Sequence, residues 1–407
     1  MSKNTREIDA YYVTAVNGER TIVEAEPLSP GSAVTQKQIR VGIIGANAKV
    51  GWAKVSHIPA INGIPGLKLA AVATRNEESA RLAAESFGAD RWYSDPLAMI
   101  RDERIDLITI SVKVPAHRQL VLAALEARKA VYCEAPLGRS VAEAEEMASA
   151  AGSLHTAIGL QGRLNPAVRR AAELVSSGSI GRPLNARIVS TNVGIGPELP
   201  SSYDFYNKTS SGANTVTISG GHTLDLVEAI LGAIIEVDAR TEILWPVVKL
   251  TDTGEESVRE TADYVSVMGK THAGAVFTAD IYGGVAPKAT RSSLEIRGSE
   301  GWLRLTGDHP YSFQGGDIKL ASNLPFVIPE EASASGGFRG AAINVGEVYA
   351  SLVRDLRAGT YSTPGLEHAL HNARLIEAVM RAGERGERQN ILKQIERFED
   401  ARVTSIR

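Results

Sequence analysis

Short apolar runs alternate with amphipathic stretches over the first part of this chain. The apolar runs lie at 39–46, 67–74, 105–112 and 129–135, with helical periodicity in the segments between them. Near-continuous apolar strands alternating with amphipathic helices are typical of a parallel sheet covered by helices on both faces. The pattern therefore predicts a doubly wound α/β domain over residues 39–158.

Polar residues mark where two of these helices should begin. Asn76 precedes an amphipathic stretch and is a suitable N-cap residue. Ser140 and Glu143 have the spacing of a capping box in front of another such stretch. A third helix is expected at 117–128, between two of the apolar runs. The polar signals thus agree with the alternation of strands and helices.

The pattern of apolar and polar residues changes after residue 158. Alternating apolar and polar residues joined by glycine turns predict antiparallel strands with hairpins at 184–193, 262–284 and 291–308. Helical periodicity accompanies them at 165–178, 221–232, 343–359 and 365–386. The chain therefore divides into four predicted parts: an N-terminal extension (1–38), the parallel-sheet domain (39–158), an α+β domain (159–395) and a tail (396–407).

Composition narrows the class of partner. The 407-residue chain carries 44 basic and 47 acidic residues, a net charge of −3, and neither sign forms a block, which argues against a nucleic-acid partner. No apolar run approaches the roughly 18 residues of a membrane span, and the polar start lacks the apolar core of a signal peptide. The single cysteine, Cys133, fits a reducing compartment. We expect a cytoplasmic protein without a membrane partner.

The stretch GIIGANAKVGWAKVSH follows the first predicted strand and opens a helix. A glycine-rich turn in that position offers free backbone N–H groups to the pyrophosphate of a dinucleotide. In the G-x-G-x-x-G fingerprint, Gly45 fits the first position, Asn47 replaces the second glycine and tolerates a positive φ, and Gly51 comes one residue late. The loop predicts an NAD(P) site; the alternative is a glycine turn without a ligand. Further cofactor contacts are expected from Ala48, Lys49 and Trp52.

The second predicted strand ends at Thr74 and Arg75, without the carboxylate that would hold a ribose diol. An arginine in that place suits the 2′-phosphate of NADP. We therefore expect NAD(P) as the cofactor, with NADP favoured over NAD. The alternative is that Arg75 is a solvated surface charge.

Several ordered stretches between residues 39 and 390 resemble the glucose–fructose oxidoreductase/inositol dehydrogenase (Gfo/Idh/MocA) family. Besides the glycine-rich loop they are AVYCEAPLG, GLQGRLNPAVRRAAELVSSGSIG, GGHTLDLVEAILG and LEIRGSEGWLRL. Gly51-Trp52, LQGR and VTISGGHTLDL are most similar to the branch that contains the yeast galactose-pathway repressor and its bacterial relatives. The resemblance implies a Rossmann domain, a second domain with a large open-faced, mostly antiparallel sheet, a site in the crevice between them, and homodimers or homotetramers.

The family's typical reaction moves a hydride between NAD(P) and a hydroxyl-bearing carbon of a sugar, inositol or related polyol. Its usual acid–base trio is the lysine of Glu-Lys-Pro, an aspartate, and a histidine four residues after that aspartate. By resemblance these positions fall on Ala135, Ile218 and His222, so only the histidine is kept. The resemblance thus implies a site with the family's shape but without its usual catalytic set.

Residues near the predicted helix 221–232 are candidates for the missing chemistry. His222 opens that helix, where a neutral imidazole is favoured and could act as a base, and Asp225 could orient it. Tyr206 and Lys208 lie upstream in an irregular polar segment and could replace the lysine, although each could also belong to an ordinary surface loop. We expect substrate contacts from Arg163, Asn214 and Asp225.

Position along the fold gives further candidates. Strand ends that should face the nicotinamide carry Ser111, Val112, Lys113, His117, Glu134, Ala135 and Gln161. Lys113 could supply a replacement cation, and Arg163 could form a structural ion pair in place of a substrate contact. His368 and His371, three residues apart, are interpreted as helix surface because no carboxylate or cysteine cluster accompanies them, so no metal is expected.

Three functions are compatible with these residues. The favoured one is an NAD(P)-dependent oxidoreductase that acts on a sugar-like or polyol substrate with a rearranged acid–base set, because the cofactor loop and His222 are retained. The second is a non-catalytic dinucleotide-binding sensor, which Ala135 and Ile218 favour. The third is a lyase or glycosidase that uses tightly bound NAD(P) in a closed redox cycle.

Overall fold

The computed structural model describes residues 15–16, 19–20, 37–286, 291–328 and 337–391. The chain divides into two compact units, residues 1–37 and residues 38–407, and the second unit holds both predicted domains. In the first unit the described residues form two paired strands, β1 (Ala15–Val16) and β2 (Glu19–Arg20). Most of the predicted extension and all of the predicted tail lie outside the described residues.

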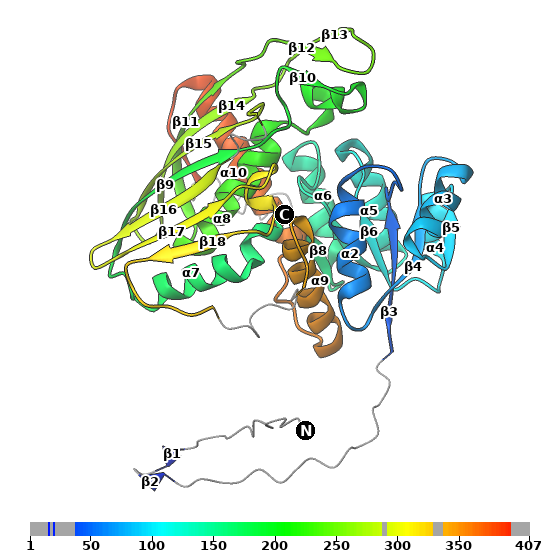
Figure 1. The fold of residues 1–407 in the computed structure, drawn as a ribbon, viewed down its shortest axis with the longest axis horizontal. Coiled ribbons are helices and arrows are strands. Elements are labelled where there is room, and N and C mark those ends of the chain that lie inside the picture. Colours follow the sequence, from blue (N-terminus) through cyan, green and yellow to red (C-terminus); the bar gives the residue numbers. More distant parts are fainter. Residues whose placement is uncertain (1–14, 17–18, 21–36, 287–290, 329–336, 392–407) are drawn as a thin grey trace, which may run out of the picture. The chain divides into compact units, whose positions relative to one another are not determined.

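Six parallel strands form the first sheet, in the order β5-β4-β3-β6-β7-β8 (Figure 1). Their bounds are β3 (Ile39–Ile44), β4 (Leu67–Ala73), β5 (Arg91–Tyr93), β6 (Leu107–Ile110), β7 (Ala130–Cys133) and β8 (Thr156–Ile158). This confirms the predicted doubly wound domain. The strand order reverses between β3 and β6, and ligands of such sheets bind at the carboxyl edge near that reversal.

Between residues 52 and 151 six α-helices connect these strands: α1 (Trp52–Val55), α2 (His57–Gly63), α3 (Glu77–Phe87), α4 (Pro96–Arg101), α5 (His117–Glu126) and α6 (Val141–Ala151). The Asn76 side chain accepts a hydrogen bond from Ser79 N at 2.9 Å, as an N-cap should. Ser140 caps α6 in the same way, through Glu143 N at 3.2 Å. The Glu143 carboxylate binds Arg139 N instead of returning to Ser140, so only half of the predicted capping box forms.

Eight strands form the second sheet, in the order β18-β17-β16-β9-β15-β14-β11-β19, and every pair is antiparallel except β9 with β15. Their bounds are β9 (Pro183–Thr191), β11 (Ile234–Glu242), β14 (Tyr264–Thr271), β15 (Val276–Tyr282), β16 (Ser292–Gly298), β17 (Trp302–Gly307), β18 (Lys319–Ser322) and β19 (Gln389–Asn390). The mostly antiparallel sheet of the second domain is thus confirmed.

Helices cover one face of this sheet: α7 (Pro166–Ser176), α8 (Gly221–Leu231) and α10 (Leu366–Arg385) (Figure 1). Their side chains, among them Val168, Leu224 and Leu375, pack in one core with the buried residues of the strands. Along β15, buried positions alternate with exposed or half-buried ones. Alternate side chains of a strand point to opposite faces, so the uncovered face is the more polar one.

The last two helices join the two sheets. Helix α9 (Ala341–Ala358) buries Val345 and Tyr349 in the core of the first domain. Helix α10 buries Leu370 in the first domain and Leu375 in the second. A boundary drawn along the sequence therefore does not separate the two cores, because the chain returns to the first sheet after building the second.

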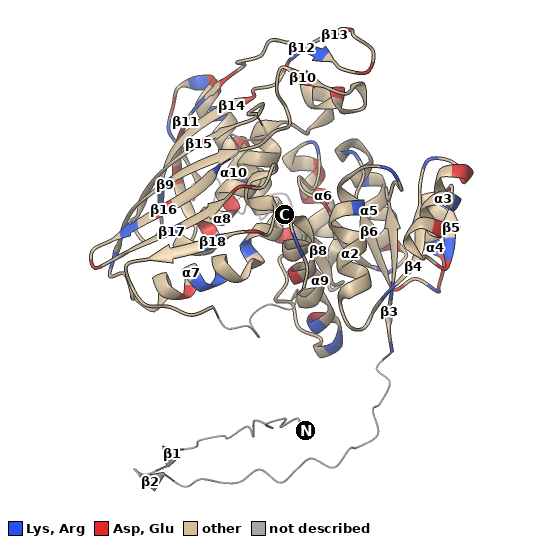
Figure 2. Ribbon diagram, viewed as in Figure 1, with Lys and Arg blue, Asp and Glu red and all other residues tan. Residues whose placement is uncertain are grey.

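Charged residues of both signs are interspersed over the two sheets and their helices (Figure 2). This distribution agrees with the near balance of 44 basic and 47 acidic residues in the sequence. None of the helices in the described segments combines the length and the apolar character that crossing a membrane requires.

A small three-stranded sheet, which the sequence did not predict, consists of β10 (Glu198–Leu199), β12 (Val247–Leu250) and β13 (Glu256–Val258). It is followed along the chain by the buried ion pair of Arg259 with Asp263. Arg259 also donates to Asn207 Oδ1 at 2.9 Å and to the carbonyl oxygen of Gly196 at 2.7 Å. These bonds tie the irregular segment around η3 (Ser201–Asn207) to the start of β14.

We expect Arg259→Leu to lower the free energy of unfolding by about 3–5 kcal/mol, because the buried Asp263 carboxylate would lose its cation. The exposed pair of Arg240 with Glu242 offers a control, since Arg240→Leu should cost less than about 1 kcal/mol. Urea denaturation of both variants measures the difference. Equal losses would show that Arg259 does not secure the segment.

Candidate functional site

The loop after β3 has the backbone conformation that its glycines predicted. Gly45 has a φ of +98°, and a Cβ built on it would lie 2.1 Å from the carbonyl oxygen of Ser111. Gly51 has a φ of +112° and directly precedes α1. Both positions favour glycine because of their positive φ. Gly45 has a second reason, because the backbone that leaves β6 passes too close to leave room for a Cβ.

Asn47 shapes this loop through its side chain. Its Oδ1 accepts hydrogen bonds from the backbone N–H groups of Lys49 (2.8 Å) and Val50 (3.2 Å). Its φ is not positive, so the predicted reason for an asparagine here is wrong. The residue instead closes an Asx-type turn, with Ala48 inside the turn and Lys49 exposed at its surface.

Trp52 begins a short helix. Helix α1 has four residues, and Ser56 separates it from α2. The indole Nε1 of Trp52 is buried and has no hydrogen-bond partner among the described residues. Its ring meets the Tyr311 ring edge-on, with centroids 6.0 Å apart, so the predicted cofactor loop touches the second domain.

At the tip of β4, Thr74 and Arg75 lead into α3. The Thr74 hydroxyl lies 2.6 Å from Ser79 Oγ, which commits it to the start of that helix. Arg75 is exposed and forms no ion pair within the described part of the chain. Its guanidinium is therefore available to a ligand at this edge.

A chain of buried hydrogen bonds ends just beyond β7. Glu134 Oε1 lies 2.8 Å from Nε2 of His57, and Nδ1 of His57 lies 2.9 Å from the Tyr349 hydroxyl. The same hydroxyl lies 2.8 Å from Oγ1 of Thr109 on β6. The sequence placed Glu134 at the cofactor but gave no sign of the other three residues. Ala135 follows Glu134 and is half-buried at the same edge.

Gln161 follows β8, and its side chain is wholly buried. Neither its Oε1 nor its Nε2 has a hydrogen-bond partner among the described residues. Since buried amides are nearly always hydrogen-bonded, these two atoms point to a polar ligand. Two strands away, the end of β6 is followed by Ser111 and Val112.

His222 lies at the start of α8, directly after the π-helical turn η5 (Thr215–Gly220), which contains Ile218. Such turns occur frequently at functional sites. His222 is 9% exposed, and its ring has no hydrogen-bond partner within the described segments. Burial lowers the pKa of His222, and the nearby carboxylates of Glu134 and Asp225 oppose this in part. The ring is therefore neutral near pH 7 and free to accept a proton.

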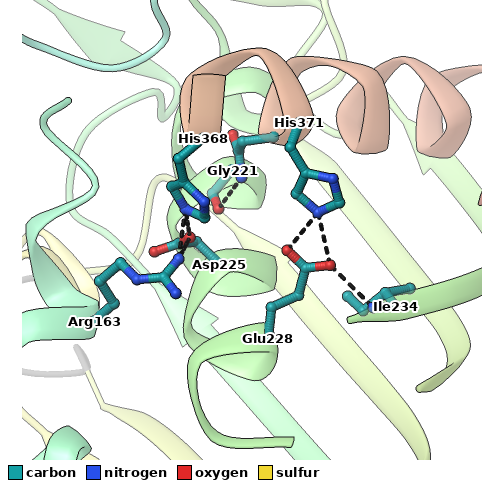
Figure 3. A network of polar contacts seen from close by, with 8 residues as sticks. Arg163, Gly221, Asp225, Glu228, Ile234, His368 and His371 are labelled. Carbon is teal, nitrogen blue, oxygen red and sulfur yellow. Dashed lines mark hydrogen bonds and ion pairs between the residues drawn. The ribbon is translucent and has the colours of Figure 1, made fainter. Parts of the chain in front are cut away.

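Asp225 belongs to a charge network rather than to a catalytic pair. Its buried carboxylate accepts hydrogen bonds from Arg163 and from His368, each at 2.5 Å (Figure 3). Glu228 accepts from His371 at 2.9 Å. Arg163 thus forms the structural ion pair that was the alternative to a substrate contact. The interpretation of His368 and His371 as helix surface is wrong, because both hold carboxylates of α8.

Two further bonds complete the network in Figure 3. The Asn372 amide donates to the carbonyl oxygen of Gly221 at 3.1 Å. The Glu228 carboxylate also accepts from the backbone N–H of Ile234 at 2.9 Å. Helix α10 therefore holds α8 at its first and second turns, and this fixes the position of His222.

Three predicted site residues are engaged in the scaffold. Lys208 Nζ donates to the carbonyl oxygen of Val258 at 3.0 Å. His117 is buried, and its Nε2 lies 3.0 Å from the carbonyl oxygen of Val112. Asn214 Oδ1 accepts from the first N–H groups of η5 and caps that turn. These contacts engage the Lys208 ammonium, the His117 ring and the Asn214 carbonyl oxygen in the scaffold.

Aromatic side chains of η3 lie next to the loop after β6. Lys113 Nζ is 4.4 Å from the centre of the Phe205 ring. Tyr206 stacks on Tyr203 with centroids 5.9 Å apart, and burial raises the pKa of Tyr206. Tyr206 therefore keeps its proton near neutral pH, so it can donate a hydrogen bond but cannot act as the base.

A pocket of about 300 Å³ lies at the opposite edge of β8, beside His155, Asp355 and Tyr361. Its polar groups are already occupied, because Thr363 donates to Asp355 at 2.6 Å and His155 stacks on Tyr361. Groups of His, Cys, Asp and Glu able to hold a metal are absent from the described residues. The unpartnered polar atoms of Trp52 and Gln161 lie at the carboxyl edge of the first sheet, and we place the candidate functional site there.

Two family models match the chain. Residues 39–160 match the Gfo/Idh/MocA model, described as "Oxidoreductase family, NAD-binding Rossmann fold". Residues 166–307 match the model described as "Gal80p, C-terminal domain". The first match contains the whole parallel sheet, and the second contains the central strands of the larger sheet.

Related proteins include dehydrogenases and regulators. Dehydrogenase aclE of Aspergillus oryzae is 35% identical over 231 residues, 53% of this chain and 61% of that protein. The galactose/lactose metabolism regulatory protein GAL80 of Kluyveromyces lactis is 31% identical over 301 residues, 67% of this chain and 65% of that protein. The chain thus spans less than two thirds of either one. D-apiose dehydrogenase of Paraburkholderia graminis is 23% identical, over 89% of this chain and 92% of that protein.

Solved structures share the fold. A super-repressor mutant of Gal80p from Saccharomyces cerevisiae superposes with a TM-score of 0.76, covering 87% of this chain and 98% of that chain. The sequence identity in that comparison is 24%, so the likeness concerns the fold alone.

His371 gives the fold a predictable pH dependence. The Glu228 carboxylate raises the pKa of His371 although burial opposes it. Because the pKa of His371 is higher in the folded state, the pair with Glu228 stabilises the fold fully at a pH below the ordinary histidine pKa. This stabilisation is lost as the pH rises through the pKa of the folded state. We expect the Tm of the wild type to fall as the pH rises from about 5.5 to about 8.5, and His371→Gln should abolish this part of the pH dependence of Tm. The exposed His272 supplies a control; His272→Gln should keep the wild-type slope, and a wild-type slope in His371→Gln would refute the assignment.

Proposed function

Since the chain belongs to the Gfo/Idh/MocA family of oxidoreductases, we propose that it binds NAD(P) at the carboxyl edge of the first sheet and acts on a sugar-like or polyol substrate. The observation that carries this proposal is Gln161, a wholly buried amide whose two polar atoms are unpartnered among the described residues. It lies one strand from Glu134 and three strands from the Gly45 loop, on the edge where dinucleotides bind to such sheets.

The residues at this edge fit a dinucleotide. At Gly51 no described atom lies within 4 Å of the place where a Cβ would stand, so the backbone there is uncovered for a pyrophosphate. The buried Nε1 of Trp52 and the amide of Gln161 offer donors and an acceptor that the described protein does not use. NAD(P) bound there would supply or accept a hydride, which no side chain can do.

His222 is the proposed acid–base residue. Its neutral ring would take the proton of a substrate hydroxyl when the carbon bearing it is oxidised, and would return that proton in the reverse direction. The carboxylates of Glu134 and Asp225 lie near enough to favour the imidazolium that then forms. Ala135 and Ile218 stand in the positions of the family's other two catalytic groups and contribute no proton.

The substrate class rests on the aromatic surface and on the relatives. Tyr203, Tyr206 and Phe205 lie together on η3, and Tyr311 adjoins Trp52. Small-molecule sites are mostly apolar and aromatic, with a few polar groups that fix the orientation of the ligand. The apolar face of a sugar or polyol and its hydroxyl groups match that combination. D-apiose dehydrogenase, a relative over most of the chain, is named for a sugar.

A second candidate function is a dinucleotide-binding regulator without turnover. The specific observation in its favour is the pair of residues Ala135 and Ile218, which can neither move a proton nor hold a hydroxyl. The GAL80 relative is named as a regulatory protein. Such a protein would keep the cofactor edge intact and have no need of His222.

Cofactor binding and turnover separate the two candidates. We expect saturable binding of at least one of NAD, NADH, NADP and NADPH, and an absorbance change at about 340 nm with one member of a polyol and sugar panel. His222→Ala should lower kcat by about 10²–10⁴-fold, because it removes the acid–base group, while cofactor affinity stays within about twofold.

Two controls accompany this test. Exposed His272→Ala should leave kcat unchanged, and Gly45→Val should abolish cofactor binding, since its side chain would collide with the Ser111 carbonyl group. Binding without turnover on the whole panel would favour the regulator. Turnover that survives in His222→Ala would remove His222 from the mechanism.

The preference for NADP is proposed on Arg75 alone. The exposed guanidinium at the tip of β4 has no ionic partner among the described residues, and charge-assisted hydrogen bonds to a phosphate are worth about 1.5–3 kcal/mol. Arg75→Ala should therefore weaken NADPH binding by about tenfold or more and leave NADH binding unchanged.

Arg81→Ala is the matched control, because Arg81 lies on the following helix and pairs with Glu85. Dissociation constants from cofactor fluorescence measure both variants. Equal losses of NADPH and NADH affinity in Arg75→Ala would overturn the proposed preference.

A further inference from the structure

Glu134 presents a carboxylate at the carboxyl edge, beside the proposed acid–base residue. Its side chain is 14% exposed, so it reaches the surface of the site while most of it is covered. The space for this carboxylate exists because the next strand end is Gly159, where a Cβ would lie 2.7 Å from Glu134 Oε2. His222 lies within electrostatic reach of the same carboxylate.

A series of hydrogen bonds holds Glu134 in place. A carboxylate only accepts, so the wholly buried His57 donates from Nε2 to Oε1. Burial raises the pKa of Tyr349, so its hydroxyl keeps its proton and can donate to Nδ1 of His57. Thr109 in turn lies within hydrogen-bond distance of that hydroxyl. This series of hydrogen bonds fixes the position of the carboxylate.

No lysine or arginine among the described residues forms an ion pair with Glu134. The cations that follow the two neighbouring strands, β6 and β8, have other partners, since Lys113 lies over the Phe205 ring and Arg163 pairs with Asp225. Ala135 stands where the family's lysine would place a positive charge directly beside this carboxylate. The ion-pair partner of Glu134 among the described residues is therefore a histidine, His57, and not a permanent cation.

We propose that Glu134 makes this site discriminate between the two redox states of the cofactor, in favour of the oxidised one. The inference rests on the proposed binding of NAD(P). The second half of a doubly wound sheet, here β6 to β8, receives the nicotinamide half of the dinucleotide. The oxidised nicotinamide ring is positively charged and the reduced ring is neutral. A partly buried carboxylate attracts the charged ring strongly and the neutral ring hardly at all, because local screening is weak.

The ratio of the dissociation constants for the oxidised and reduced cofactor tests this proposal and needs no turnover. Glu134→Gln keeps the size of the side chain and an acceptor for His57 but removes the charge. We expect it to shift the ratio by about tenfold or more against the oxidised form, with the affinity for the reduced form within about threefold of the wild type. Exposed Glu146→Gln on α6 is the control and should leave the ratio unchanged.

Ala135→Lys provides a second variant that does not disturb the buried chain. A cation beside Glu134 should shift the ratio in the same direction as Glu134→Gln. An unchanged ratio in both variants, or equal weakening of both redox forms, would overturn the role of Glu134 while leaving cofactor binding intact. Absence of binding of either form to the wild-type protein would instead refute the proposed function itself, and this inference with it.

Discussion

The site depends on the packing of α9 against the first sheet. This helix follows the second sheet in the chain, yet Tyr349 is wholly buried in the first domain. Burying one large side chain contributes about 1.5–3 kcal/mol, and a buried phenol also requires hydrogen-bond partners. His57 and Thr109 supply them. The contact that joins the domains therefore also orients the histidine that holds Glu134.

Helix α10 positions α8 in a similar way, through buried polar contacts. The buried carboxylate of Asp225 is paired with Arg163 and His368, and a second pair follows one turn later. Removing ions from water costs about as much as their attraction returns, so such pairs define geometry more than they add stability. Here the geometry is the placement of α8, whose first turn carries His222. Both helices that contact the two domains, α9 and α10, thus position residues at the carboxyl edge: α9 positions Glu134 through His57, and α10 positions His222 through α8.

The parallel sheet was predictable because apolar runs, N-caps and Gly45 are local signals. Short strands such as β5 and β10 were not predicted, because a strand of three residues or fewer is too short to show a periodic pattern. The series of hydrogen bonds from Glu134 through His57 to Tyr349 was not predicted for another reason. Its partners are 77 and 292 residues apart, and nothing in a single sequence marks which buried polar groups will meet. Asn47 was identified at the right place but for the wrong reason, because its side chain, and not its φ, makes the turn.

In the proposed site, Ala135 and Ile218 differ in their effects. Neither side chain can deprotonate a substrate, but Ala135 also leaves Glu134 without a described lysine or arginine beside it. Under the proposed function, the Glu134 carboxylate would serve two purposes: it would favour an imidazolium on His222, and it would favour a positive nicotinamide. The first matters to an enzyme and the second to a sensor of redox state. In that scheme His222 is the residue that distinguishes an enzyme, which turns the cofactor over, from a regulator that only binds it.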